Sequence, residues 1–158
     1  MSDMHIEPEE FGERYLSEGA AIDFDGVTVR LRHVVPAVAG GSRLVVEFED
    51  YVDEPVQAVC CATSKGMFEV DGEKSRRLVF WADNSPRVVT ATLTNRVPAE
   101  VVLWNAWRRG ADGIDAGLRY AGMTVTELGE RHWRFRCSDG IGGPDFDDLV
   151  FTARIVGV

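Results

Sequence analysis

The sequence predicts an all-β fold: an antiparallel two-sheet β-sandwich of about ten short strands, with a short N-terminal helix. Two observations predict it. Apolar and polar residues alternate along many short segments, and turn signals such as Asp71-Gly72 separate these segments. No long helical pattern interrupts them. Strands at this spacing are typical of antiparallel sandwiches and barrels, and we favour the sandwich.

The first expected element is a short helix in the acidic N-terminal segment. Phe11, Tyr15 and Leu16 fall near one face of a helix there. From Gly26 onward the period changes from that of a helix to that of a strand. We therefore expect residues 1–25 to form an arm with a short helix and residues 26–158 to form the sandwich domain.

The clearest early strand begins at Val27, where Val27, Val29 and Leu31 alternate with polar residues. The further strands expected are 43–51, 56–63, 67–70, 77–81, 88–94, 100–107, 123–128, 133–138 and 149–156. Neighbouring strand residues point to opposite faces, so Cys60 and Cys61 are expected on different faces as small hydrophobes. The same alternation predicts that Phe151, Trp81 and Trp133 are core residues.

Composition limits the function classes. A formal net charge of −9 without any basic run argues against nucleic acid as a partner. The first residues lack the features of a secretory leader, and no apolar run approaches the roughly 20 residues of a membrane span. Three cysteines, two of them adjacent, make a poor disulfide framework. We expect a cytoplasmic protein without a membrane partner, and the preference for arginine over lysine indicates a bacterial origin.

Catalytic signatures are missing from the sequence. It contains no Gly-x-Ser-x-Gly, His-Glu-x-x-His or Cys-x-x-Cys motif and no phosphate-binding glycine loop. The histidines His5, His33 and His132 lie in separate segments, and nothing in the sequence brings them together. We therefore expect a protein that is not an enzyme.

Two tryptophans are candidate ligand-binding residues. Trp104 and Trp107 are an odd number of positions apart, so in one regular strand they face opposite sides and do not both enter the same core. An exposed tryptophan could stack on a sugar ring, fill a subunit interface or lie under a loop. Arginines on the expected solvent faces are either simply solvated or suited to an acidic partner surface or an anionic glycan.

The segment from Cys137 to Ala153 carries the sharpest chemical signal. It holds Asp139, Asp145, Asp147 and Asp148 in a glycine-rich turn, without any Lys or Arg. Four carboxylates held close together repel one another, and a calcium ion relieves this by taking six to eight oxygen ligands. These four residues are therefore candidate calcium ligands. The alternative is a β-turn in which the Asp side chains cap local amides.

This loop resembles the calcium-binding ending of the small bacterial calcium-dependent fucose- and mannose-binding lectins, and a similar motif in bacterial adhesin domains. The resemblance lies in Asp145-Phe-Asp-Asp-Leu-Val-Phe followed by a short strand to the end of the sequence. It implies that Asp145, Asp147 and Asp148 ligate calcium, with Asp139 as an upstream acidic ligand. Asp147 stands where those lectins have asparagine, so one ion rather than two is expected.

Three hypotheses for function follow. The first is a non-enzymatic binding protein with a calcium-stabilised loop, with a carbohydrate as its ligand. The second is a metal-free cytoplasmic domain for protein–protein interaction or homo-oligomerisation, in which exposed Trp and Arg residues form the interface. The third is a hydrolase that uses paired loop carboxylates.

Overall fold

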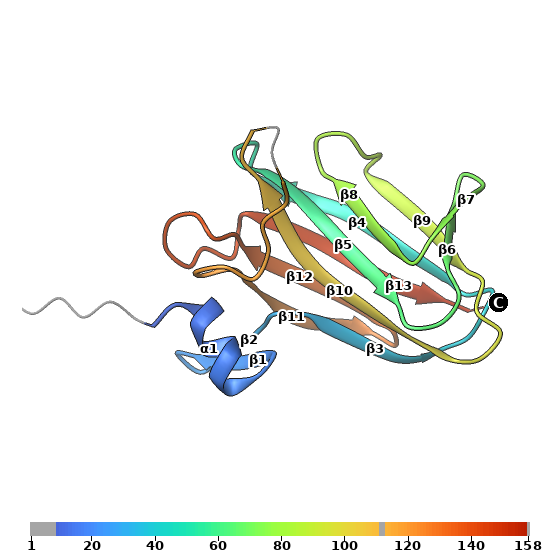
Figure 1. The fold of residues 1–158 in the computed structure, drawn as a ribbon, viewed down its shortest axis with the longest axis horizontal. Helices are drawn as coiled ribbons and strands as arrows, with labels where there is room; N and C mark the ends of the chain where they lie inside the picture. Colours follow the sequence, from blue (N-terminus) through green and yellow to red (C-terminus); the bar gives the residue numbers. More distant parts are fainter. Residues whose placement is uncertain (1–8, 111–112, 158) are drawn as a thin grey trace, which may run out of the picture.

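The computed structural model describes residues 9–110 and 113–157 as two antiparallel sheets packed face to face, with one short helix at an end (Figure 1). The helix is α1 (Phe11–Glu18). The strands are β1 (Ala21–Phe24), β2 (Val27–Arg30), β3 (His33–Val38), β4 (Arg43–Tyr51), β5 (Val56–Thr63), β6 (Phe68–Val70), β7 (Glu73–Ser75), β8 (Arg77–Trp81), β9 (Val88–Leu93), β10 (Ala99–Arg108), β11 (Gly122–Gly129), β12 (His132–Ser138) and β13 (Leu149–Val156). The predicted all-β sandwich with an N-terminal helix is confirmed.

The two sheets differ in size. The larger has nine strands in the order β1-β2-β11-β12-β13-β4-β9-β6-β7, and the smaller has four in the order β3-β10-β5-β8. The last strand, β13, lies inside the larger sheet between β12 and β4. In the smaller sheet, the long strands β5 and β10 are central and pair over eight residues.

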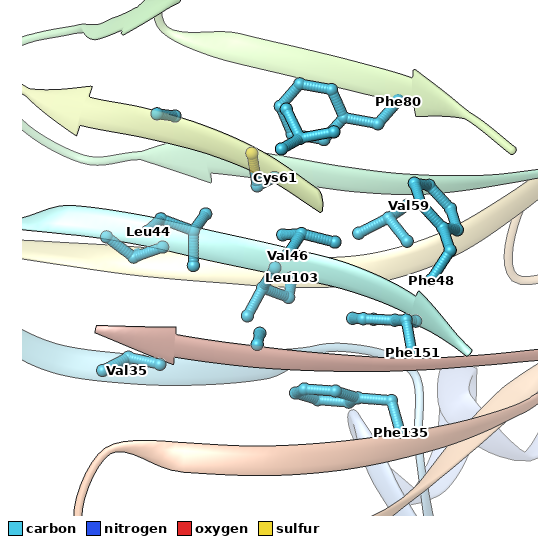
Figure 2. Close-up of a cluster of buried hydrophobic side chains, with 14 of the residues drawn as sticks. Val35, Leu44, Val46, Phe48, Val59, Cys61, Phe80, Leu103, Phe135 and Phe151 are labelled. Carbon is cyan, nitrogen blue, oxygen red and sulfur yellow. The ribbon is translucent and has the colours of Figure 1, made fainter. Parts of the chain in front are cut away.

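The core fills the space between the sheets (Figure 2). Leu44 and Phe151 enter it from the larger sheet, while Val59, Cys61 and Leu103 enter it from the smaller one. Phe151 is 0% exposed and stacks on Phe135 of the neighbouring strand, with ring centroids 4.6 Å apart. The predicted burial of Phe151 is confirmed.

All ten predicted strands are present, with ends that differ by at most a few residues. Three strands were not expected: β1, β3 and β7. β3 contains Pro36, which is tolerated because β3 is an edge strand of the smaller sheet. β7 has only three residues, all polar, so no alternation of apolar residues marks it. β1 has four residues and pairs with β2 in a hairpin turned by Asp25-Gly26.

The helix α1 lies beside a second, smaller cluster of buried residues at one end of the sandwich. Phe11 is 0% exposed, and Tyr15 donates a hydrogen bond from its hydroxyl to the carbonyl of Ala121 at 2.8 Å. Leu16, which was expected on the same face, is 91% exposed. The residues that the structure describes contain no helix long and apolar enough to cross a membrane.

Candidate functional site

The acidic loop, residues 139–148, connects β12 to β13 at the same end of the sandwich as α1 (Figure 1). Phe146 fixes the loop to the helix, because its ring stacks near that of Phe11 at a centroid distance of 6.3 Å. The four aspartates of this loop are not equivalent. Asp139 and Asp148 are buried, while Asp145 and Asp147 are exposed.

Asp139 is a buried hydrogen-bonding centre. Its Oδ2 accepts a hydrogen bond from Gln57 Nε2 at 2.9 Å, and its Oδ1 accepts one from the amide of Ile141 at 2.9 Å. Its own amide donates to Asp148 Oδ2 at 2.9 Å. Because Gln57 belongs to β5, Asp139 ties the loop of the larger sheet to the smaller sheet.

The exposed aspartates also make local contacts. Asp145 Oδ1 accepts a hydrogen bond from the amide of Asp147 at 3.1 Å, and Asp147 Oδ1 accepts one from the Arg136 guanidinium at 3.4 Å. The hydroxyl of Ser138 accepts a hydrogen bond from the Asp145 amide at 3.1 Å. The loop therefore contains the amide-capping turns that the sequence offered as the alternative to a metal site.

The fold raises the pKa of the Asp148 carboxyl. Burial is the main cause that raises its pKa to about 6; the neighbouring carboxylates of Asp139 and Asp145 contribute in the same direction, and the hydrogen bond from the Asp139 amide acts against them. Within residues 9–110 and 113–157, no group of three or more His, Cys, Asp or Glu side chains is arranged to hold a metal ion. Calcium binding by this loop stays a prediction.

Two buried amides, which were not among the candidate residues predicted from the sequence, support the loop. Gln57 is 0% exposed and Asn105 is 3% exposed. Asn105 donates a hydrogen bond from Nδ2 to the carbonyl of Ser138 at 3.0 Å, one residue before Asp139. Each amide lies on the inward face of its strand, in phase with the core residues Val59 and Leu103, and a polar residue at a core position was the signal that could have identified them.

A second candidate site is the outer face of the smaller sheet, which we call the tryptophan face. Strand alternation and register place there Val34 of β3, Val56, Ala58, Cys60 and Ala62 of β5, Arg77, Val79 and Trp81 of β8, and Glu100, Val102, Trp104, Ala106 and Arg108 of β10. Its centre consists of small residues that the two tryptophans cover. The tryptophan face is thus mostly apolar, and its charged residues are Arg77, Arg108 and Glu100.

The arginines of the tryptophan face lie over its aromatic rings. Cζ of Arg108 lies 4.4 Å from the centroid of Trp81, and Cζ of Arg77 lies 6.0 Å from that of Trp104. Both are cation–π contacts. Among residues 9–110 and 113–157, neither guanidinium forms an ion pair. Both arginines can therefore also bind an external anionic group.

The odd spacing of Trp104 and Trp107 has the predicted result that they face opposite sides of β10. Trp107 is 2% exposed and lies on the inner side against Gly140, whereas Trp104 is partly exposed on the tryptophan face.

Trp81, which was expected in the core between the sheets, is partly exposed on the tryptophan face. That prediction was wrong because alternation does not reveal which face of a strand is covered. Trp133 does pack against the main core.

The cysteines follow their predicted alternation. Cys61 enters the core between the sheets, and Cys60 lies under the tryptophans of the opposite face. Burial raises the pKa of Cys60 to about 12 and keeps its thiol protonated at neutral pH.

Comparison with known proteins identifies no relative: no family model, no curated protein and no solved structure matches this chain.

Proposed function

We propose that the protein is a non-enzymatic binding module that docks an acidic protein partner on its tryptophan face. One observation carries this proposal: the outer face of the four-stranded sheet is apolar, although an antiparallel sheet that faces water normally presents polar residues there. The helix α1 packs against β1 rather than over this face (Figure 1).

The outer face of the nine-stranded sheet provides the contrast. It carries polar residues such as Thr152 on β13 and Arg134 on β12. Arg134 pairs with Glu49 on β4 at 2.6 Å, so these two charges neutralise each other. One protein therefore has one polar and one apolar outer face. The apolar one is the better candidate for contact with a partner, because exposed apolar patches often mark interaction sites.

The chemistry of the tryptophan face favours an acidic protein as the partner. Tryptophan and arginine are the residues enriched at the energetic centres of protein interfaces. Arg77 and Arg108, against the single carboxylate of Glu100, give this face a net positive charge within a chain of net charge −9. A second copy docked face to face would bring these arginines together, which disfavours self-association through this surface. An acidic partner with apolar contact residues fits both the charge and the apolar area.

The test starts with affinity capture using the wild type and the variants Trp81→Ala and Arg108→Gln. Each captured protein is then purified and titrated against the three forms. The proposal expects a binary complex that each variant weakens at least about tenfold and that weakens as salt rises, because charge complementarity contributes to docking. Arg43→Gln, on the larger sheet, should leave binding unchanged. Two results would refute the proposal: a partner affinity that neither variant changes, or a wild-type dimer that Trp81→Ala dissociates.

A calcium-supported carbohydrate site at the acidic loop is the second candidate. The observation in its favour is that Asp139, Asp145 and Asp148 lie close enough for the first two to raise the pKa of the third. A divalent cation would relieve that repulsion. A glycan array probed with calcium and with chelator tests it, and glycan binding that requires calcium would favour this candidate over the protein-docking module.

A further inference from the structure

A groove of about 650 Å³ borders the tryptophan face where α1 approaches it. Tyr15 and Leu16 of α1 form one wall, and Val102 and Trp104 of β10 contribute to the other. The segment at Gly117 closes part of the rim. The volume falls within the range of about 300–1,000 Å³ that is usual for small-molecule sites.

The lining of the groove is mostly apolar. Leu16 is 91% exposed although it belongs to a helix whose other large apolar residues are buried, and Val34 of the edge strand is 42% exposed. Leu16 and Val34 lie on opposite walls of the groove, and both side chains face solvent. A ligand with an apolar body would remove them from water, which is the main favourable contribution to small-molecule binding.

The charged residues in the lining favour an anion. Arg32 and Arg77 line the groove, against one carboxylate, Glu100. Neither arginine forms an ion pair among residues 9–110 and 113–157. In a chain with net charge −9, a groove with two unpaired guanidinium groups is a local reversal of charge. Guanidinium groups bind carboxylates through paired hydrogen bonds, so a carboxylate is the matching head group.

We propose that this groove binds a small amphiphilic carboxylate, with its apolar body between α1 and β10 and its carboxylate at Arg32 and Arg77. The proposal does not depend on the protein partner of the tryptophan face. The two surfaces share Val34, Ala62, Arg77, Glu100, Val102 and Trp104. Leu16 and Arg32 line only the groove, whereas Trp81 and Arg108 belong only to the face. Variants of Leu16 and Arg32 therefore test the groove alone, and variants of Trp81 and Arg108 test the tryptophan face alone.

The probe is decanoate below its micelle concentration, titrated by calorimetry and by amide chemical shifts of the full chain. Decyltrimethylammonium, with the same alkyl chain and the opposite charge, is the matched control ligand. We expect decanoate to bind saturably with shifts at Leu16 and Gly117, and to bind at least about tenfold more tightly than the ammonium, because only the carboxylate pairs with the arginines.

Arg32→Gln should weaken decanoate at least about tenfold and leave decyltrimethylammonium unchanged. Leu16→Ser should weaken both ligands, and it should not impair folding because Leu16 is exposed. Arg108→Gln is the control that should change neither. Equal binding of the two ligands, decanoate binding that Arg32→Gln leaves intact, or no saturable binding to the wild type would each overturn the proposal.

Discussion

Trp104 lies directly opposite Cys60 in the register of β10 and β5, and together with Trp81 it covers the small residues at the centre of the tryptophan face. Cys60 is 2% exposed for that reason. The other two cysteines are buried elsewhere, at 0% exposure each. The reactivity of the Cys60 thiol therefore measures whether the tryptophan side chains cover the centre of the tryptophan face.

Trp104→Ala should make one thiol reactive toward Ellman's reagent in the folded protein. Removal of the ring exposes Cys60 and lowers its pKa from about 12 toward the ordinary value. Each unit of that change raises the thiolate fraction about tenfold, so the reaction should accelerate at least about tenfold. Trp104→Phe, which keeps a ring over the thiol, is the control. An unchanged thiol reactivity in folded Trp104→Ala would show that Trp104 does not protect Cys60.

Phe151→Ala should lower the free energy of unfolding by about 3–5 kcal/mol, because it opens a cavity in the core and removes the stacking on Phe135. Urea denaturation measures the change. Thr152→Ala, on the outer face of the same strand, should cost less than about 1 kcal/mol. A loss below about 1 kcal/mol for Phe151→Ala would mean that the core is not packed as described.

Gly140→Ala should destabilise the protein by about 1–3 kcal/mol through overpacking. A Cβ at Gly140 would lie 2.5 Å from Cζ2 of Trp107 and 3.0 Å from the carbonyl oxygen of Leu118. Gly143→Ala is the matched control in the same loop, because a Cβ there meets no atom within 4 Å. If both variants unfold at the same denaturant concentration as the wild type, Trp107 does not pack on the acidic loop.

His33 should make the protein less stable as the pH falls below 6.5. Burial against Trp133 and Phe135, and the nearby charge of Arg30, lower the pKa of His33 to about 4. Between these pH values the unfolded chain takes up a proton that the folded protein does not, so stability is complete above pH 6.5 and falls toward pH 4. At pH 5 the loss has an upper limit of about 2 kcal/mol, which the partial exposure of the ring reduces.

His33→Phe should remove this contribution, and urea denaturation at pH 7.5 and pH 5 measures it. The comparison of variant with wild type is needed because Asp148 acts in the opposite sense. Its raised pKa of about 6 means that the folded protein binds a proton more tightly, so its contribution stabilises the fold as the pH falls. An identical pH dependence in wild type and His33→Phe would show that His33 is not held neutral by the fold.

Calcium should raise the melting temperature if the acidic loop binds it as the sequence predicts. A ligand at about 100 times its Kd stabilises the native state by about 2.7 kcal/mol. Melting curves with millimolar calcium and with chelator measure the shift. Asp147→Asn keeps an oxygen ligand and should preserve the shift, whereas Asp147→Ala should abolish it. Identical wild-type melting curves, together with no ion by elemental analysis, would refute calcium binding.

The sequence alone determined ten of the thirteen strands in the described part of the chain, and the alternation of sides along each of them. Alternation is a local property, because successive side chains of an extended chain point in opposite directions whatever surrounds them. It therefore located all ten expected strands, separated Cys60 from Cys61 and Trp104 from Trp107, and buried Phe151. It missed β1, which has only four residues, and it missed β3 and β7, where a proline or an all-polar composition hides the period.

Only the tertiary structure decided which of two equivalent faces is covered. Trp81 alternates as a core residue does, and its place on an outer face follows from the register of β8 with β5, which puts Trp81 opposite Ala58 and Phe80 opposite the core residue Val59. The partners of Asp139 were equally hidden, since Gln57 lies 82 positions away along the chain. Burial and pairing depend on contacts between distant segments, and a local pattern does not specify those contacts.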